Sequence, residues 1–299
     1  MRATIQLCTY NRAALLERVL DACFEQSVAD DIYEVVLVND GSTDATPEVI
    51  ERARARATCA FITVNQQNAG LAAGRNVGVA RARGERIIFI DDDVLPLPNF
   101  VEAHLASHER HPRAIVRGAA INVESFDDLP PPVWSIAQYS ANYFWTTNVS
   151  VPLETLRAVG AFNESFSEYG WEDIDVGLRL RFAGVRATFN PQALVYHYKP
   201  RAHADNVEAM VRQARAQART AVQLARLHPH WRTYLATGNY AAARMLHGAI
   251  RSFGVPKRCR GTLHELPPDR TLSDAELRAA RRLAKDAYFE ELERARTAT

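Results

Sequence analysis

Strand-like and helix-like patterns of apolar residues alternate along the first hundred residues of the chain. The strand-like segments are short apolar runs, and the run at 33–38 is almost unbroken, which is typical of a strand buried in a parallel sheet. The helix-like segments repeat apolar positions every three or four residues. The predicted strands are 5–9, 33–38, 61–64 and 86–90, and the predicted helices are 12–26, a segment ending at 56 that Ser42 or Thr43 caps, and 69–83. This order predicts an α/β, Rossmann-like fold with a mainly parallel sheet flanked by helices.

The pattern is less regular between 115 and 200 and becomes helical after 206. The elements expected in the irregular part are extended segments at 149–151 and 193–196 and helices at 154–159 and 174–182. From 206 onward the apolar residues form one stripe with arginines beside it, as on an amphipathic helix. We therefore expect one domain over 1–200, with halves at 1–115 and 116–200, and a mostly helical C-terminal region over 201–299.

The formal charge is distributed unevenly along the chain. Residues 1–200 contain 18 Lys and Arg against 25 Asp and Glu, whereas residues 201–299 contain 18 against 10, so a net charge of +1 conceals an acidic front and a basic tail. Two interpretations stay open for the tail: a solvated helical surface, or contact with an anionic surface such as lipid headgroups or a lipid-phosphate acceptor. We expect no nucleic-acid partner, because aromatic residues do not interleave with the basic ones.

Three further features bear on the compartment. No run of about 18 apolar residues is present, so no membrane-spanning helix is expected. The first residues enter a strand-like pattern at once, without the apolar stretch and cleavage site of a signal peptide. The four cysteines are scattered, which argues against a disulfide framework or a cysteine zinc site. We predict a cytoplasmic protein, with attachment to the inner face of a membrane as the open alternative.

Three consecutive aspartates, Asp91, Asp92 and Asp93, follow the apolar strand at 86–90. Carboxylates packed so closely repel one another unless a cation lies among them, and Mg²⁺ and Mn²⁺ prefer such oxygen ligands. Successive residues of an extended chain point to opposite sides, so Asp91 and Asp93 should share a direction and Asp92 should point away. A solvated acidic turn or a helix cap is the alternative interpretation.

Polar residues also follow the first two predicted strands. Asp40 can accept the N3–H of a uracil ring, although it could instead cap the next helix, and for Asp44 we prefer the capping role. Thr9 to Arg12, with Tyr10 and Asn11 between them, could supply backbone hydrogen bonds and an aromatic wall to the same base. Ordinary packing of Tyr10 is equally open. Because the carboxyl ends of parallel strands share one sheet edge, we expect these groups to lie near the three aspartates.

Four segments taken in series resemble family 2 glycosyltransferases of the GT-A fold. They are 9–12, 39–44, 68–78 and 91–93, and the resemblance covers residues 1 to about 200. It implies that Asp40 binds the donor base and that Asp91 and Asp93 form a D-x-D motif whose metal bridges the donor diphosphate. It also implies a nucleotide-binding half over 1–115 and an acceptor half over 116–200.

The same resemblance extends to residues between and after these segments. It implies that Asn68, Gly70 and Arg75 lie near the ribose or diphosphate, although Arg75 can equally pair with Asp91. The segments 147–151 and 160–164 are similar to the part of the family that leads into the acceptor site.

The segment 168–175 is an acidic helix start beside an aromatic residue. The helix dipole favours carboxylates there, which is a purely structural explanation for some of them. Direct sugar transfer with inversion needs one base for the acceptor hydroxyl proton, and the resemblance assigns that role to Asp173, with Glu172 helping to hold the acceptor. Glu172 as the base and a structural role for both stay open. Trp171 could stack under a sugar ring of the acceptor.

His197 follows the predicted strand at 193–196. A lone histidine is usually not a metal ligand, but the resemblance implies that His197 completes the metal shell with Asp93. Neutral imidazole favours Mn²⁺ over Mg²⁺. His203 is a weaker candidate for the site than His197, and would lie in a loop over the donor diphosphate.

The resemblance therefore implies an inverting, metal-dependent transferase that moves a sugar from a UDP-sugar to a saccharide, lipid-linked or small-molecule acceptor. A dTDP-sugar stays open, because thymine also offers an N3–H. A sugar nucleotidyltransferase would carry a glycine-rich phosphate loop near the N-terminus, and 8–12 contains no glycine; a non-catalytic nucleotide-sugar-binding domain is the other alternative. Region 201–299 could cap the acceptor cleft, form a homodimer or lie on a membrane surface.

Overall fold

The computed structural model describes residues 1–140 and 142–298, whose contacts divide the chain into two compact units. The N-terminal unit comprises Met1–Ser167 and Glu172–Pro200. The C-terminal unit comprises Glu168–Trp171 and Arg201–Thr299. The short segment Glu168–Trp171 thus belongs by its contacts to the C-terminal unit, although it interrupts the sequence of the other.

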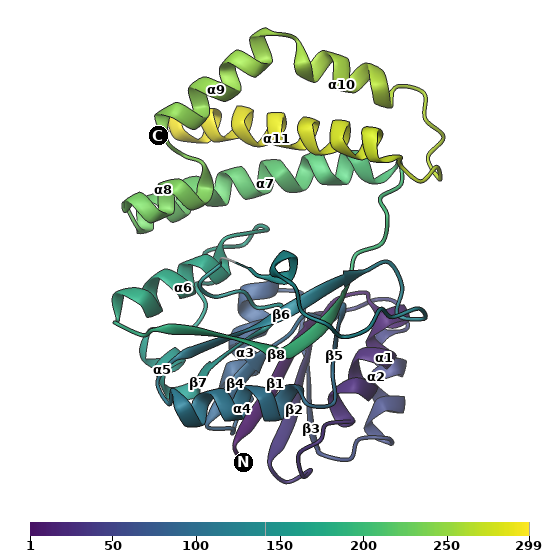
Figure 1. The fold of residues 1–299 in the computed structure, drawn as a ribbon, viewed down its shortest axis with the longest axis vertical. Helices are drawn as coiled ribbons and strands as arrows, with labels where there is room; N and C mark the ends of the chain where they lie inside the picture. Colours follow the sequence, from purple (N-terminus) through teal and green to yellow (C-terminus); the bar gives the residue numbers. More distant parts are fainter. Residues whose placement is uncertain (141, 299) are drawn as a thin grey trace. The chain divides into compact units, whose positions relative to one another are not determined.

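The N-terminal unit is built on an eight-stranded sheet with the order β3-β2-β1-β4-β7-β6-β8-β5 (Figure 1). Its strands are β1 Ala3–Thr9, β2 Tyr33–Asn39, β3 Ala60–Asn65, β4 Arg86–Phe89, β5 Val94–Pro96, β6 Ile115–Val123, β7 Val149–Pro152 and β8 Ala187–Tyr198. The pairs β1–β2, β1–β4, β2–β3 and β6–β8 are parallel. β7 is antiparallel to β4 and β6, and β5 is antiparallel to β8. The predicted α/β fold with a mainly parallel sheet is confirmed.

Helices cover both faces of this sheet (Figure 1). They are α1 Ala13–Phe24, α2 Thr46–Arg54, α3 Leu71–Arg81, α4 Phe100–Arg110, α5 Leu153–Ala158 and α6 Glu172–Phe182, with a 3₁₀ turn at Ile136–Gln138. Consecutive side chains of a strand point to opposite faces. In β4, Ile88 joins the core formed with α1, α2 and α4, whereas Ile87 and Phe89 join the core formed with α3, α5 and α6. Burial on both sides explains why this strand is apolar at every central position.

The predicted start of α2 was wrong, since neither Ser42 nor Thr43 caps the helix. The Ser42 hydroxyl accepts a hydrogen bond from the Asn11 amide at 2.9 Å, and the Thr43 amide donates to the Asn11 side chain at 2.8 Å. The helix begins at Thr46, whose amide donates to Asp44 at 3.0 Å. A carboxylate near the first free amides satisfies donors that the helix leaves open, as expected for Asp44.

The stretch between the three aspartates and residue 123 contains three elements that the sequence pattern did not reveal: β5, α4 and β6. β5 has only three residues and ends in Pro96, which suits its place at the sheet edge. α4 buries His104, Ser107 and His108 beside its apolar residues, so its inner face lacks the apolar repeat of an amphipathic helix.

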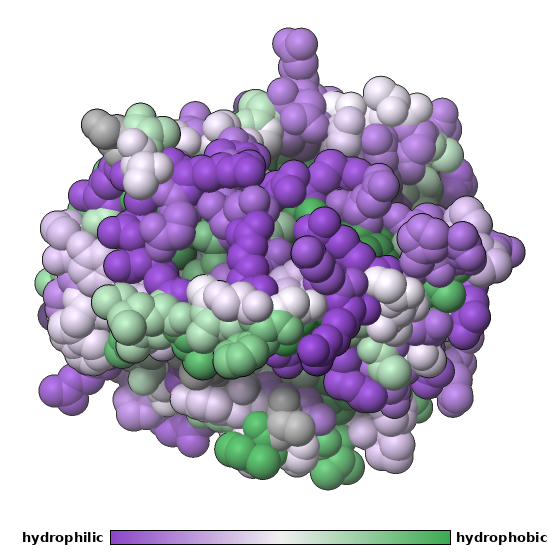
Figure 2. Space-filling model, turned by 90° about the horizontal axis from the view of Figure 1, so that it is seen from above, coloured by the Kyte–Doolittle hydropathy of each residue, from purple (hydrophilic) through white to green (hydrophobic). Residues whose placement is uncertain are grey.

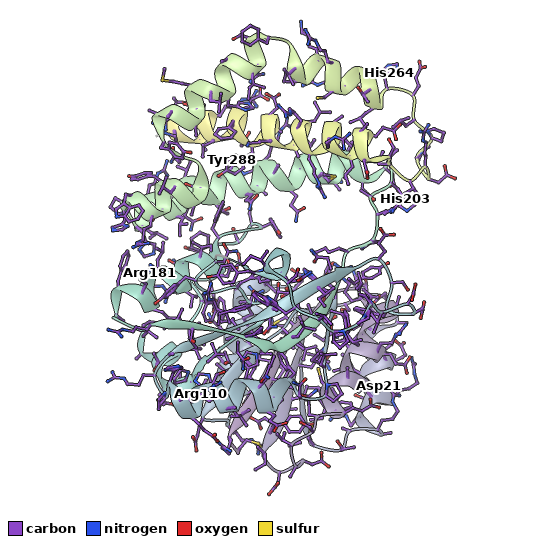
Figure 3. The ribbon with its side chains drawn as sticks, viewed as in Figure 1. Asp21, Arg110, Arg181, His203, His264 and Tyr288 are labelled. Carbon is purple, nitrogen blue, oxygen red and sulfur yellow. The ribbon has the colours of Figure 1, made fainter. Side chains whose placement is uncertain are left out.

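Helices are the main elements of the described part of the C-terminal unit after residue 205, as the pattern predicted, with an isolated bridge between His203 and Thr271. They are α7 Asn206–Leu227, α8 Trp231–Thr237, α9 Ala241–Ser252, α10 Val255–Leu263 and α11 Asp274–Thr297. α7 and α11 lie side by side, with Ala218 and Ala221 of α7 packed in one cluster with Leu292 of α11 (Figure 1). Tyr288 of α11 donates its hydroxyl proton to the Thr237 carbonyl oxygen at 2.6 Å, which ties α11 to the end of α8 (Figure 3).

Two expectations on cysteines and membrane spans can be compared with the structure. All four cysteines are free, and Cys8, Cys23 and Cys59 are buried. In the part of the chain that the structure describes, no helix is at once long and apolar enough to cross a bilayer.

Candidate active site

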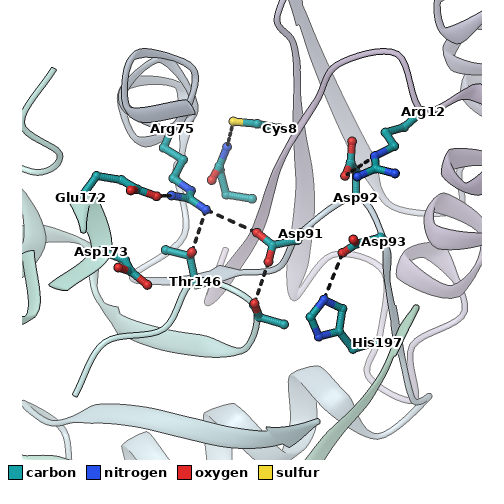
Figure 4. Close-up of polar contacts among 12 residues, drawn as sticks. Cys8, Arg12, Arg75, Asp91, Asp92, Asp93, Thr146, Glu172, Asp173 and His197 are labelled. Atoms are coloured by element: carbon teal, nitrogen blue, oxygen red, sulfur yellow. Dashed lines mark hydrogen bonds and ion pairs between the residues drawn. The ribbon is translucent and has the colours of Figure 1, made fainter. Parts of the chain in front are cut away.

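The three aspartates lie in the turn between β4 and β5, at the carboxyl end of β4. Asp91 accepts a hydrogen bond from the Thr147 hydroxyl at 2.6 Å. Asp92 points the other way, toward Arg12, whose guanidinium nitrogen lies 3.8 Å from its carboxylate (Figure 4). Burial raises the pKa of Asp92 to about 7. These residues form a turn, which the Val94 amide closes by donating to the Asp91 carbonyl oxygen at 3.2 Å, and not the extended chain on which the expectation rested; Asp92 nevertheless points away from the other two carboxylates, as expected.

His197 reaches the acidic turn through the pairing of two strands. β5 runs antiparallel to β8 with Val94 opposite His197, and the Tyr198 amide donates to the Asp93 carbonyl oxygen at 2.9 Å. As a result, His197 Nε2 lies 3.4 Å from Asp93 Oδ1 (Figure 4). Asp91, Asp93 and His197 each offer one ligand atom, and these atoms lie within 4.8 Å of one another.

This cluster fits a divalent cation. Asp93 Oδ1 is buried and makes no hydrogen bond among residues 1–140 and 142–298; its ion-pair contact is His197 Nε2 at 3.4 Å, so the two atoms face each other as a cation's ligands would. Burial, the largest single influence, would raise the pKa of Asp93, but the imidazole of His197 together with Lys199 and Arg12 holds it below its ordinary value. Two carboxylates and an imidazole form a donor set that Mn²⁺ accepts.

Asp40 holds the turn that leads into α3. Its Oδ1 accepts hydrogen bonds from Gln66 Nε2 at 2.6 Å and the Ala69 amide at 2.9 Å, and its Oδ2 accepts one from the Gly70 amide at 3.0 Å. An ionised carboxylate offers about four acceptor positions, so one remains for a ligand. Sequence reasoning expected the base-facing role but missed this structural one, because only the folded turn brings the two amides to Asp40.

Two glycines allow the loops around Asp40 to approach each other. Gly41 has φ +81°, and a Cβ there would lie 2.7 Å from the Asn68 amide nitrogen, closer than real Cβ contacts. Gly70, with φ +88°, immediately precedes α3. Both backbone conformations favour glycine. Asn68 therefore lies directly against the turn that follows β2.

The segment after β1 forms one rim with the segment after β2. The hydrogen bonds of Asn11 to the turn at 42–43 tie the two loops together, and Asn11 itself has φ +53°. Tyr10 is about half exposed, which leaves an aromatic ring accessible at this rim, whereas Thr9 is buried. The residues proposed from sequence to surround a base thus share one edge of the sheet.

Arg75 connects the acidic turn to the start of α6. Its guanidinium lies 2.8 Å from Glu172 and 3.3 Å from Asp91, and it donates to the Thr146 hydroxyl at 2.6 Å (Figure 4). The same group lies over the Phe162 ring. The side chain is buried. The structure therefore shows the pairing of Arg75 with Asp91, and it adds a second carboxylate that sequence reasoning had not connected with Arg75.

Two threonines just before β7 belong to this network. Thr146 binds Arg75, and Thr147 binds Asp91. Sequence reasoning did not single out Thr146, and it placed Thr147 only in a segment leading to the acceptor side. A pair of threonines before a short strand carries no periodic signal that would have identified them.

Asp173 lies in the first turn of α6, next to Glu172. Burial and the neighbouring Glu172 carboxylate raise the pKa of Asp173 to about 7, although Arg75 works against them. Its Oδ1 accepts a hydrogen bond from the Ile174 amide at 2.7 Å. A carboxylate with a pKa near neutrality can take a proton from a hydroxyl that is losing one.

Trp171 and His203 both make contacts inside the C-terminal unit. The Trp171 indole donates to the Gln217 carbonyl oxygen at 2.7 Å, and its backbone has φ +73°. His203 Nδ1 lies 2.8 Å from the Asp269 carbonyl oxygen, just before α7 (Figure 3). Trp171 directly precedes Glu172 in the chain. By its contacts, however, Trp171 belongs to the C-terminal unit, whereas Glu172 belongs to the N-terminal unit.

Comparisons with known proteins place these observations in context. A family model described as "Glycosyl transferase family 2" matches residues 4–163, more than half of the chain. The chain is 28% identical over 245 residues to validoxylamine A glucosyltransferase of Streptomyces hygroscopicus subsp. jinggangensis; the match covers 70% of this chain and 58% of the relative. It thus spans less than two thirds of that relative's length.

Solved structures share the fold. The mannosyltransferase PcManGT from Pyrobaculum calidifontis, in complex with GDP-Man and Mn²⁺, matches with a TM-score of 0.64 and 20% identity, over 99% of this chain and 86% of that one. S. aureus TarS 1–349, in complex with UDP-GlcNAc, matches with a TM-score of 0.57 and 18% identity, over 100% of this chain and 93% of that one. At these identities the likeness shows the fold alone.

Proposed function

The chain belongs to glycosyl transferase family 2, and from this premise we propose that it transfers a sugar from a nucleoside diphosphate sugar to an acceptor hydroxyl, with inversion at the anomeric carbon. The observation that carries the proposal is the convergence of Asp91, Asp93 and His197 within 4.8 Å of one another. Asp40 follows β2, which β1 separates from β4, at the same sheet edge. In open α/β sheets, ligands bind at this edge.

Asp91, Asp93 and His197 are the residues that would hold a divalent cation. The imidazole favours Mn²⁺ over Mg²⁺, and the structure of PcManGT contains Mn²⁺. A cation bound there supplies positive charge against the diphosphate that leaves. The buried Asp93 Oδ1 supports this assignment, because apart from the ion-pair contact at 3.4 Å to His197 Nε2 it makes no hydrogen bond among the described residues, and a buried carboxylate oxygen so weakly satisfied is costly.

The donor we propose is a UDP-sugar. Asp40 retains acceptor capacity for the N3–H of uracil after its three hydrogen bonds to the protein. The exposed ring of Tyr10 offers a surface on which the base can stack. Asn68, Gly70 and Arg12 border the same rim and would face the ribose and diphosphate. TarS, which shares the fold, has been solved with UDP-GlcNAc.

Asp173 is the proposed general base. The acceptor oxygen forms a bond to the anomeric carbon of the donor, its proton passes to the Asp173 carboxylate, and the bond from that carbon to the phosphate oxygen breaks, with its electron pair leaving on the nucleoside diphosphate. The raised pKa of Asp173 matches such a transfer near neutral pH. Glu172, held by Arg75, would contact the acceptor through its other oxygen.

A donor screen tests this function. UDP should raise the melting temperature of the protein only when Mn²⁺ is present, and the protein should release UDP from one of a panel of UDP-sugars when an acceptor is supplied. Asp173→Asn should lower turnover by about 10²–10⁴-fold while the Mn²⁺-dependent UDP shift persists. Asp93→Ala should abolish that shift, and Asp128→Asn, an exposed control in the same unit, should change neither. Full turnover in Asp173→Asn would refute the assignment of the base.

A further inference from the structure

The C-terminal unit contains a long stretch with only one sign of charge. Between 209 and 264 the chain has ten arginines and lysines and no aspartate or glutamate. This stretch includes most of α7 and all of α8, α9 and α10. Basic residues without interspersed acids attract anionic surfaces, and the attraction weakens with salt.

Helix α9 presents its apolar side outward. Three large side chains on that side are strongly exposed, with exposed fractions of 75% for Met245, 64% for Leu246 and 75% for Phe253, which follows the helix. We call Met245, Leu246 and Phe253 the apolar stripe. On a surface helix the apolar side normally faces the core, so this orientation is the reverse of the usual one.

The other side of α9 is fixed by specific contacts, so the outward orientation is not accidental. His247 is buried, its Nε2 lies 3.0 Å from Asp286 of α11, and its ring stacks on Phe289 at 4.6 Å between centroids. Two ion pairs also join α9 to α11: Arg244 with Glu293, and Arg251 with Glu290. With these contacts made, α9 cannot turn its apolar stripe inward.

Unpaired cations lie on the neighbouring helix α10. Lys257, Arg258 and Arg260 are exposed, and no carboxylate of the described residues lies within ion-pairing distance of them. Further cations line a cavity of about 500 Å³ between α9, α10 and α11. Apolar side chains such as Ile250 and Phe289 line it, as does the carboxylate of Asp286, which pairs with His247. The four cations that line it are Arg278, Arg281, Arg282 and Lys285. Figure 2 shows hydrophobic residues beside strongly hydrophilic ones on the face seen from above.

We propose that the face formed by α9, α10 and the cavity beside α11 binds a membrane that contains anionic lipids. The apolar stripe enters the boundary between headgroups and acyl chains, and the cations of α10 and of the cavity contact lipid phosphates. Nucleic acid would satisfy the cations but would leave the apolar stripe in water. A symmetric dimer would pack this face against the same face of a second copy. The cations of the two copies would then lie close together and repel each other. This inference goes beyond the transfer reaction and does not depend on it.

Sedimentation with lipid vesicles tests the proposal. The full chain should pellet with vesicles of phosphatidylcholine that contain about one quarter phosphatidylglycerol, remain in the supernatant with phosphatidylcholine alone, and bind less as salt rises. The stripe variant, Met245→Gln with Leu246→Gln and Phe253→Gln, and the charge variant, Lys257→Glu with Arg258→Glu and Arg260→Glu, should each bind at least about tenfold more weakly. The single substitution Leu246→Gln, which removes one of the three apolar side chains, should weaken vesicle binding less than the stripe variant does.

A matched control separates this face from net charge. The variant Arg81→Glu, Arg110→Glu and Arg113→Glu makes the same change of charge at exposed positions of the N-terminal unit and should bind as the parent protein does. Melting temperatures check that each variant is folded. The proposal fails if the parent protein does not pellet, if the control loses binding as the charge variant does, or if the stripe variant binds normally. It also fails if light scattering shows a dimer that the stripe variant dissociates, or if the protein binds nucleic acid but no vesicles.

Discussion

Replacing Arg75 by methionine should destabilise the N-terminal unit more than most single substitutions. Methionine retains the apolar length of the side chain but removes the guanidinium that lies 2.8 Å from Glu172 and 3.3 Å from Asp91. Arg75 is only 4% exposed, so water cannot replace it beside these carboxylates. The hydrogen bond to the Thr146 hydroxyl would be lost as well.

The magnitude follows from the burial of the groups left behind. Removing one partner of a buried ion pair typically costs about 3–5 kcal/mol, because the remaining charge is desolvated without compensation. The Glu172 side chain is 12% exposed and would bear most of this penalty, whereas Asp91, at 28%, keeps some hydration. We therefore expect a loss of about 3 kcal/mol in the free energy of unfolding, at the low end of that range.

Urea unfolding of four proteins measures this loss: the parent, Arg75→Met, Glu172→Gln and the double variant. If the pair accounts for the penalty, Arg75→Met should cost at least about 1 kcal/mol less in the Glu172→Gln background. Arg81→Met, on the exposed side of the same helix, should change stability by no more than about 0.5 kcal/mol. A cost below about 1 kcal/mol for Arg75→Met, or strict additivity in the double variant, would refute the reasoning.

Three further outcomes are expected. Because burial raises the pKa of Asp173 to about 7, kcat/KM for transfer should climb with pH up to near 7, and a profile already flat above about pH 5 would contradict its role as base. Burial lowers the pKa of His104 to about 4 and of His108 to about 3, from 6.5 in the unfolded chain. Below about pH 6.5 the unfolded state therefore binds more protons than the folded state. The free energy of unfolding should be highest above that pH and should fall by about 2 kcal/mol per histidine between pH 7 and pH 5. Urea melts at both pH values measure this fall, and His108→Gln should make it smaller. Gly118→Ala should cost about 3 kcal/mol, since its new methyl group would overlap a backbone carbonyl oxygen of β8, whereas Gly248→Ala, which meets open space, should be neutral or stabilising in the same melts.

The sheet edge that carries Asp40 and Asp91 was predictable because its elements depend on local patterns. β1, β2 and β4 are buried runs whose ends coincide with a change from apolar to polar residues, so the sequence locates their carboxyl ends within a residue or two. Parallel strands then bring these ends together without any further information. That is why the sequence alone places Asp40 and Asp91 near each other.

Helix α4 shows why other parts could not be predicted. His104 and His108 on its inner side both contact the Ser150 hydroxyl at 2.8 Å, and Asn190 donates to Ser107 at 2.9 Å. Most of these polar groups find partners in β7 and β8, which lie more than forty residues further along the chain, although His108 Nδ1 has no hydrogen-bond partner among the described residues. A search for apolar repeats cannot anticipate a buried face whose partners are supplied by tertiary contacts.

The candidate metal site combines both situations. Asp93 follows a predictable strand, but His197 meets it only because β5, three residues long, pairs with β8 in a register that sets Val94 opposite His197. A slip of one residue in that pairing would turn His197 to the other face of the sheet and separate it from Asp93. No pattern within three residues encodes such a register, so resemblance to a family could suggest the pair whereas periodicity could not. The shortest strand of the sheet therefore determines whether a cation can be held at all.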